Sequence, residues 1–180
     1  KTHVLKRGEY DLPIGDPVQP GVIEVMGQLP EGAPGNRLGL AQWLTSRSHP
    51  LASRVMVNQS WQRIFGVGLV RTPEDFGVQG RQSTHPELLD WLSVEFQEQG
   101  WNHKQLLRTM VTSRTFCQSS ARRGDIEDSE NRLYARGPSF RLDAEVLRDV
   151  GLWASGLLDP TMGAEGGKPY QPPGMWRAMA

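Results

Sequence analysis

The sequence predicts a mainly α-helical fold: an orthogonal bundle of about five helices, with an extended N-terminal arm and a Gly/Pro-rich C-terminal tail. Between residues 36 and 158, apolar side chains recur at spacings of three and four, the period of helices buried on one face. The 20 Gly and 13 Pro residues gather in the connections and at both ends, where they disfavour regular structure. We therefore expect an arm over 1–35, a helical domain over 36–158, and an irregular tail over 159–180 that continues into a further C-terminal part of the protein.

The arm has two segments that suit short strands, His3–Lys6 and Val22–Met26. The stretch between them, Pro13–Gly21, is too rich in Pro and Gly for regular structure. We expect an extended arm, with a short hairpin as the alternative.

The first helix is expected over about residues 37–46 and the second from Pro50 to Phe65, where Gly66 ends it. The first buries one apolar face, and the second carries a stripe that is apolar except for one asparagine. These positions are Leu40, Trp43 and Leu44 in the first helix, and Leu51, Val55, Asn58, Trp61 and Phe65 in the second.

The loop over residues 66–83 is long and rich in turn residues. We expect Phe76 and Val78 to anchor it, with a hydrogen bond from Asn58 or Arg54 to its backbone. Thr84 and Glu87 have the spacing of a capping box for a third helix that ends near residue 99. This helix is expected to bury Leu88, Leu89, Leu92 and Phe96, and to place Trp91 with Trp61 in a shared core.

Three further helices follow. One is expected from Asn102 to about Phe116 and a short one over residues 131–136. The last begins at an Asp143 cap, and its apolar stripe is Val146, Val150, Trp153 and Leu157.

Charge and cysteine content exclude several classes of function. Twenty basic and twenty acidic residues cancel, so the chain has no overall field for nucleic acid. No apolar run approaches the ~20 residues that span a bilayer, which argues against direct membrane insertion. The single Cys117 excludes an intrachain disulfide and a cysteine-based zinc site, and the four histidines lack metal-ligand spacing. The segment also has no Cys-x-x-Cys-His motif for attaching haem.

Two sets of polar residues are candidate sites, and a catalytic residue is not identified. Guanidinium groups bind carboxylate or sulfate in a bidentate way, so clustered arginines suit an anion such as an acidic sugar. The alternative is an ion-pair network with Glu130, Asp143, Glu145 and Asp149. The arginines are Arg132, Arg136, Arg141 and Arg148, and the second set, either a pocket or a loop anchor, is Arg54, Asn58 and Gln62. Tyr170 and Trp176 form a candidate exposed aromatic platform in the tail.

Several motifs together resemble a known family. They are Asn36-Arg-Leu-Gly-Leu-Ala-Gln-Trp-Leu44, Ser53-Arg-Val-Met-Val-Asn-Gln-Ser-Trp61, Thr72-Pro-Glu-Asp-Phe-Gly77, Thr115-Phe-Cys-Gln-Ser-Ser120 and Asn131-Arg-Leu-Tyr-Ala-Arg-Gly-Pro138. The chain resembles a planctomycete-type domain of unknown function from the C-terminal end of large exported proteins. Cys117 departs from the pattern, because the family more usually carries a basic residue there. The resemblance implies a second domain of unknown function, and often a cytochrome-c-like haem domain, ahead of this one.

Two functions remain open at this point. The first is a structural or interaction module that supports a redox or carbohydrate-handling domain of the same polypeptide. The second is a part of an oxidoreductase or polysaccharide-processing active site. The resemblance implies an exported, periplasmic or cell-surface protein whose partners are its own other domains, with carbohydrate as a further candidate. Haem would belong to a neighbouring domain, and no cofactor is expected in this segment.

Overall fold

The computed structural model describes residues 2–122 and 124–163, and the prediction of a mainly helical fold is confirmed. The chain divides into two units, residues 1–140 and 141–180. The helices of the first unit are α1 (Arg37–Leu44), α2 (Ala52–Phe65), α3 (Pro86–Glu98), α4 (His103–Val111) and α5 (Arg114–Cys117), and the second unit contains α6 (Ala144–Ala154). The arm adds β1 (Val4–Leu5), η1 (Lys6–Gly8), β2 (Pro13–Ile14) and η2 (Glu24–Met26). No helix in the described part of the chain is long and apolar enough to span a membrane.

The arm contains a hairpin, but its second strand is not the predicted one. β1 pairs antiparallel with β2, so that Val4 faces Ile14 and Leu5 faces Pro13. The proline is tolerated because a two-stranded ribbon has free edges that need no donor. The expectation that Val22–Met26 forms a strand was wrong. Its residues close a 3-10 turn, η2, in which the Met26 amide donates to the Ile23 carbonyl at 2.9 Å.

α1 begins at Asn36, whose side chain accepts from the amides of Leu38 and Gly39. Gly39 lies against the backbone of Pro34, where a Cβ would come within 2.0 Å of the carbonyl oxygen. This close approach selects the buried face of the helix, which is Gly39 and Trp43. Leu40 and Leu44, expected to be buried, are therefore exposed.

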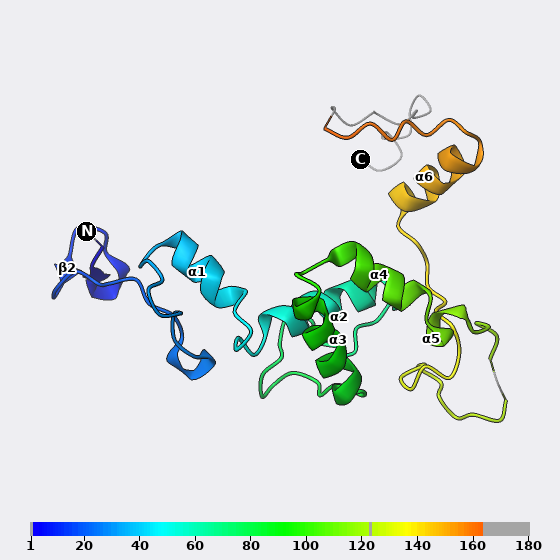
Figure 1. Cartoon of the computed structure of the whole chain (residues 1–180), viewed down its shortest axis with the longest axis horizontal. Coiled ribbons are helices and arrows are strands. Elements are labelled where there is room, and N and C mark those ends of the chain that lie inside the picture. Colours follow the sequence, from blue (N-terminus) through cyan, green and yellow to red (C-terminus); the bar gives the residue numbers. More distant parts are fainter. Residues whose placement is uncertain (1, 123, 164–180) are drawn as a thin grey trace, which may run out of the picture. The chain divides into compact units, whose positions relative to one another are not determined.

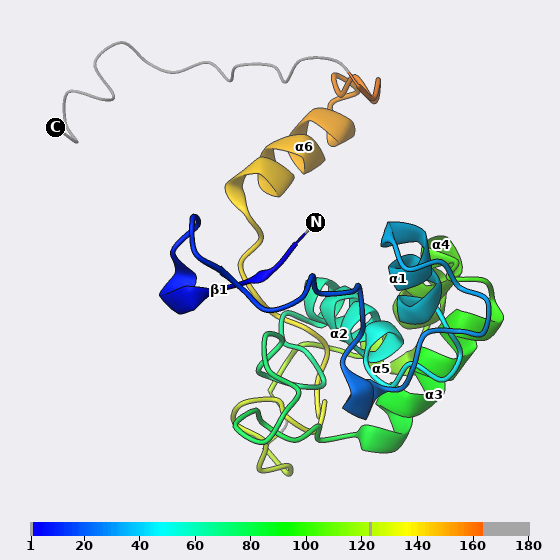
Figure 2. The same ribbon diagram turned by 90° about the vertical axis from the view of Figure 1, so that its left-hand side faces the viewer.

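The core lies between α2, α3 and α4, which are side by side in Figures 1 and 2. On α2 the indole of Trp61 stacks on the ring of Phe65, with 4.0 Å between the ring centroids. The indole nitrogen of Trp61 donates to the hydroxyl of Tyr134 at 2.8 Å. The buried core residues are Val57, Trp61, Phe65, Leu69, Val70, Leu89, Leu92, Phe96, Leu106 and Met110.

Trp91 does not share this core. Its side chain is 53% exposed, whereas Trp61 is 4% exposed, so the predicted pairing of the two tryptophans was wrong. α3 buries Leu89, Leu92 and Phe96, a face with the i, i+3, i+7 spacing of a helix. Trp91 is two positions, or about 200°, from Leu89 and therefore points away from that face.

Three other predicted helices also differ in the structure: one begins differently, one is divided in two, and one does not form. At α3 the Thr84 hydroxyl is hydrogen-bonded to Nδ1 of His85, so no capping box forms, and Pro86 begins the helix instead. The predicted 102–116 helix breaks near Thr112, and Ser113 caps the separate α5. Residues 131–136 form turns rather than a helix, because Asn131 and Tyr134 have positive φ angles of 52° and 54°.

In the second unit, α6 begins after Asp143 as predicted, although the aspartate side chain makes no capping bond. The side chains of the predicted stripe are exposed, from 44% at Val146 to 73% at Trp153, and Leu157 lies beyond the end of the helix. Tyr170 and Trp176 lie outside the described residues.

Candidate functional site: a polar hollow and an apolar groove

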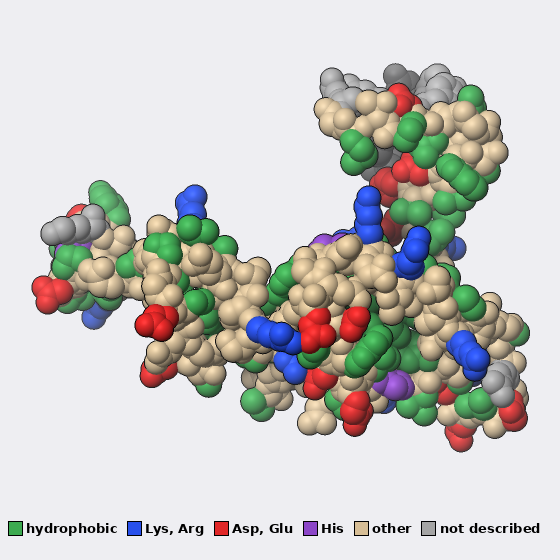
Figure 3. All heavy atoms as spheres, in the orientation of Figure 1, with side chains coloured by type: hydrophobic (Ala, Val, Ile, Leu, Met, Phe, Trp, Pro, Cys, Tyr) green, Lys and Arg blue, Asp and Glu red, His purple; other side chains and the backbone are tan. Residues whose placement is uncertain are grey.

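The four arginines of the predicted anion site fall in both units. Arg132 and Arg136 belong to the first unit, whereas Arg141 and Arg148 belong to the second. In the second unit, a guanidinium nitrogen of Arg148 lies 3.7 Å from a carboxylate oxygen of Asp149. The anion site formed by all four stays a prediction. On the face shown in Figure 3, basic and acidic side chains are interspersed.

Arg136 is held by its own loop. Its guanidinium donates to the carbonyls of Asp128 and Ser129, both at 2.9 Å. Its backbone amide donates to the side chain of Asn131, which donates in turn to the Arg136 carbonyl. These bonds occupy the guanidinium and make Arg136 a scaffold for the loop.

Asp128 organises the same loop from the inside. Its buried carboxylate accepts from the amides of Arg132 at 2.6 Å and Leu133 at 2.7 Å. Burial alone would raise the pKa of this carboxyl group. The amides of Leu133, Arg132 and Ala135, together with the charge of Arg136, outweigh burial and hold its pKa below the ordinary value.

A polar hollow of about 590 Å³ lies beside this loop. Its lining combines two hydroxyls, three carboxylates, one guanidinium and one leucine: Thr84, Glu127, Asp128, Ser129, Glu130, Arg132 and Leu133. Glu130 is paired with Arg71 at 2.9 Å. The exposed guanidinium of Arg132 has no carboxylate partner within the described ranges, and it is the member of the predicted set that borders a cavity.

The second predicted set lies along α2, and its members make different contacts. Asn58 is fully buried; its amide donates to the carbonyl of Val70 at 3.0 Å and accepts from the Val70 amide at 2.8 Å. Arg54 binds Asp90 of α3 at 2.7 Å and also donates to the Pro50 carbonyl. Gln62 is half-buried.

The loop after α2 is thus fixed by Asn58. Gly68 lies so close that a Cβ there would be 2.7 Å from both polar atoms of the Asn58 side chain. Phe76 packs against the core, but Val78, the other expected anchor, is fully exposed.

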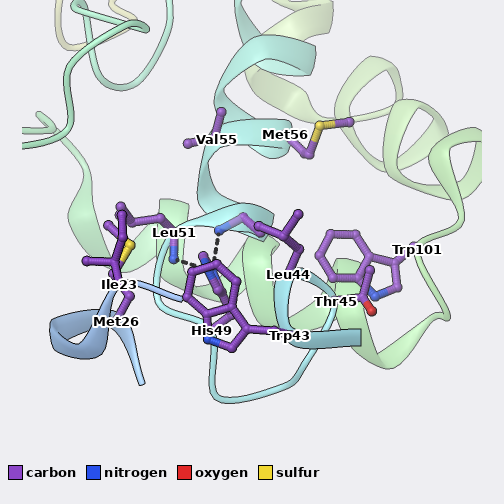
Figure 4. A pocket seen from close by; sticks show the side chains of 11 residues that line it. Ile23, Met26, Trp43, Leu44, Thr45, His49, Leu51, Val55, Met56 and Trp101 are labelled. Carbon is purple, nitrogen blue, oxygen red and sulfur yellow. Dashed lines mark hydrogen bonds between the residues drawn. The ribbon is translucent and has the colours of Figure 1, made fainter. Parts of the chain in front are cut away.

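An apolar groove of about 580 Å³ is the hollow that sequence patterns did not reveal (Figure 4). Three separate segments form it: the arm, the α1–α2 region and the turn after α3. Its lining is Ile23, Met26, Trp43, Leu44, Thr45, His49, Leu51, Ala52, Val55, Met56 and Trp101. The sequence indicates Trp43 only as a core residue, and a helical period gives no sign that residues 23, 43 and 101 meet.

His49 is the one titratable side chain of the apolar groove. Its Nδ1 accepts from the amides of Leu51 at 3.3 Å and Ala52 at 3.1 Å, the bonds dashed in Figure 4. The imidazole thus caps the start of α2 as an acceptor, which assigns the ring proton to Nε2. Nε2 is buried without a hydrogen-bond partner, and the ring meets Trp43 edge to face at 4.4 Å.

Burial lowers the pKa of His49, because desolvation disfavours the charged imidazolium. The cap acts in the same direction, since a proton on Nδ1 would replace the acceptor of two amides. The apolar groove therefore carries no charge near neutral pH. Among the described residues, no group of three or more His, Cys, Asp or Glu side chains is placed to hold a metal ion.

Comparison of the sequence with family models assigns this helical domain to a family. The chain belongs to the PSD1 family, proteins of unknown function (DUF1553), whose model matches residues 36–179. No curated protein and no solved structure matches the chain. The arm precedes the matched range, so Ile23 and Met26 reach the apolar groove from outside the family domain.

Proposed function

We propose that this domain is an interaction module of a multidomain exported protein, and that it supports a redox or carbohydrate-handling domain of the same polypeptide. The observation that carries the proposal is the apolar groove. Its volume of about 580 Å³ lies within the usual range for binding pockets, roughly 300–1,000 Å³. Open apolar surface of this kind commonly marks an interaction site in soluble proteins.

The chemistry of the lining specifies the partner surface. The groove side chains are aliphatic, aromatic or thioether groups, apart from Thr45 and the neutral His49. A charged group placed there would lose its hydration without gaining an ion-pair partner. Met26 and Met56 have flexible thioether side chains that adapt to different shapes. The partner surface is therefore apolar and uncharged.

The exported setting and the haem in a neighbouring domain are part of this proposal and rest on the family resemblance. A partner domain that carries a cofactor must hold a fixed position relative to its substrate. A rigid helical module with one apolar docking surface suits that task.

The test mixes the 180-residue chain with the remaining domains of its polypeptide and measures the dissociation constant by calorimetry. Met56→Glu places a charge in the groove and should weaken binding at least about tenfold. Trp91→Glu, at an exposed aromatic site on α3, is the matched control and should leave the affinity unchanged. Equal affinities for Met56→Glu and the unchanged chain would remove the groove from the interaction.

The polar hollow favours a second candidate, a part of a polysaccharide-processing site. Arg132 presents a guanidinium with no carboxylate partner in the described part of the chain, and Thr84 and Ser129 line the same hollow with hydroxyl groups. These groups suit a uronic-acid carboxylate and its ring hydroxyls. Calorimetric titration with uronic-acid oligosaccharides, repeated with Arg132→Ala, tests this candidate. If the binding heat is the same for the unchanged chain and for Arg132→Ala, the polar hollow is not the binding site for these oligosaccharides.

A further inference from the structure

We propose that the apolar groove is a docking site for a short apolar peptide segment, and that the chain's own residues 22–27 are its removable occupant. We name residues 22–27 the strap. This inference rests on the interaction function proposed above and specifies its mode: a segment from a partner domain replaces the strap. The partner chemistry is two aliphatic or thioether side chains three positions apart, without charge on that face.

The strap already places such a pair in the groove. Ile23 and Met26 both line it, and they are three positions apart in a 3-10 turn. A 3-10 helix has three residues per turn, so residues i and i+3 lie on the same face. Val25, between them in the strap, is 88% exposed and faces solvent. The strap therefore binds by one face, as a short docking motif does.

The strap is weakly held. Ile23 remains 60% exposed although it borders the groove. Within the described ranges, no hydrogen bond joins residues 22–33 to residues 36–140. Apolar contacts alone hold the strap in place, and a half-exposed side chain gains only part of the roughly 1.5–3 kcal/mol available from full burial.

The groove is also incompletely filled. In Figure 4, Ile23 and Met26 lie at one end, whereas Trp101 lies at the other. The volume of about 580 Å³ is what remains with the strap in place. A partner segment that reaches Leu44 and Trp101 as well would bury more apolar surface than the strap, and this difference would drive the exchange.

The flanks of the strap permit it to leave. Gly21 precedes it and Gly27 is its last residue, and Gly27 has a φ of 100°, a backbone conformation that favours glycine. The strap lies before the family domain, so its departure leaves the α2–α3–α4 core intact. Its tether to α1 is short and gives it a local concentration in the millimolar range. A free peptide must overcome that competition.

The test uses the full chain and a fluorescent peptide with the sequence of residues 20–28, Pro-Gly-Val-Ile-Glu-Val-Met-Gly-Gln. In the double variant Ile23→Ser/Met26→Ser, the strap loses both groove side chains. The peptide should bind this variant at least about fivefold more tightly than the unchanged chain, because the tethered competitor is removed. Val25→Ser is the matched control in the same segment and should leave the affinity as in the unchanged chain.

Two further measurements place the peptide in the groove. Adding Met56→Glu to the double variant should abolish peptide binding. If circular dichroism shows that this variant does not fold, Leu44→Ser, at a more exposed position of the groove, replaces it and should weaken peptide binding. A peptide with serine in place of its isoleucine and methionine should not bind.

Equal peptide affinity in the double variant and the unchanged chain would overturn the strap as an occupant. Absence of binding to either protein at about 1 mM peptide, the scale of the tethered concentration, would overturn the peptide-docking mode. In either case a Met56→Glu effect on binding to the remaining domains would leave the interaction function standing. The two proposals thus fail separately.

Discussion

The hydrogen bonds between Asn58 and Val70 give the sharpest stability prediction. Asn58→Ala removes both partners of the Val70 backbone and leaves a buried N–H and a buried C=O without hydrogen bonds. An unsatisfied buried polar group costs about 1–3 kcal/mol. Two such groups, with some relief from water entering the space, should lower the free energy of unfolding by about 3 kcal/mol.

The assay is urea unfolding followed by circular dichroism, with amide exchange of Val70 as the local measurement. Gln59→Ala, at the neighbouring exposed position on α2, is the control and should change stability by less than about 0.5 kcal/mol. Asn58→Asp adds a second test: it keeps an acceptor for the Val70 amide but presents an oxygen to the Val70 carbonyl. It should destabilise more at pH 7 than at pH 3. A loss below about 1 kcal/mol in Asn58→Ala would contradict this prediction and show that other contacts hold the loop.

Two further predictions concern the core and the α2 cap. Trp61→Ala should destabilise by about 3–5 kcal/mol in the same assay, and Trp91→Ala by less than about 1 kcal/mol; similar losses would contradict the burial difference. The lowered pKa of His49 means that the folded state binds fewer protons than the unfolded state just below the ordinary value of 6.5. Stability from neutral His49 should be complete above pH 6.5 and lost as pH falls through the folded pKa. His49→Asn retains an acceptor for the cap and should flatten this pH dependence; an unchanged slope would contradict it.

The sequence predicts the helical content well because helix faces and stop signals are local. The apolar period of residues 51–65 and the glycine at 66 specify α2 without any knowledge of its neighbours. Asn36 and Asn102 cap α1 and α4 through bonds to amides two or three residues away. Such contacts depend on short stretches of chain, so a pattern reveals them.

Burial of individual side chains depends on which face a neighbour covers. Trp91 has the size of a core residue, but the contact of α3 with α2 selects the face with Leu89 and Phe96. Similarly, the close approach of Gly39 to Pro34 turns Leu40 outward. These outcomes come from tertiary packing, for which the helical period carries no signal.

The candidate sites likewise contain residues that the sequence indicates and contacts that only the tertiary structure reveals. The sequence indicates Arg132 and Asn58 as candidate site residues. In the structure, Arg132 borders the polar hollow, and the buried side chain of Asn58 is hydrogen-bonded to the backbone of Val70 in the following loop. The apolar groove was missed because residues 23, 49 and 101 come from three distant segments. An acceptor role for His49 was also hidden, since histidine is an uncommon substitute for Ser, Thr, Asp or Asn at a helix start.

Docking of a partner segment in the apolar groove can be measured by hydrogen exchange with mass spectrometry. The proposed multidomain protein and the 180-residue chain are compared at the amides of Trp43, Thr45 and Trp101, with Trp91, whose side chain is exposed, as the reference. We expect exchange at least about tenfold slower at the groove in the proposed multidomain protein than in the 180-residue chain, and equal rates at Trp91. Equal rates at the groove in both proteins would contradict it.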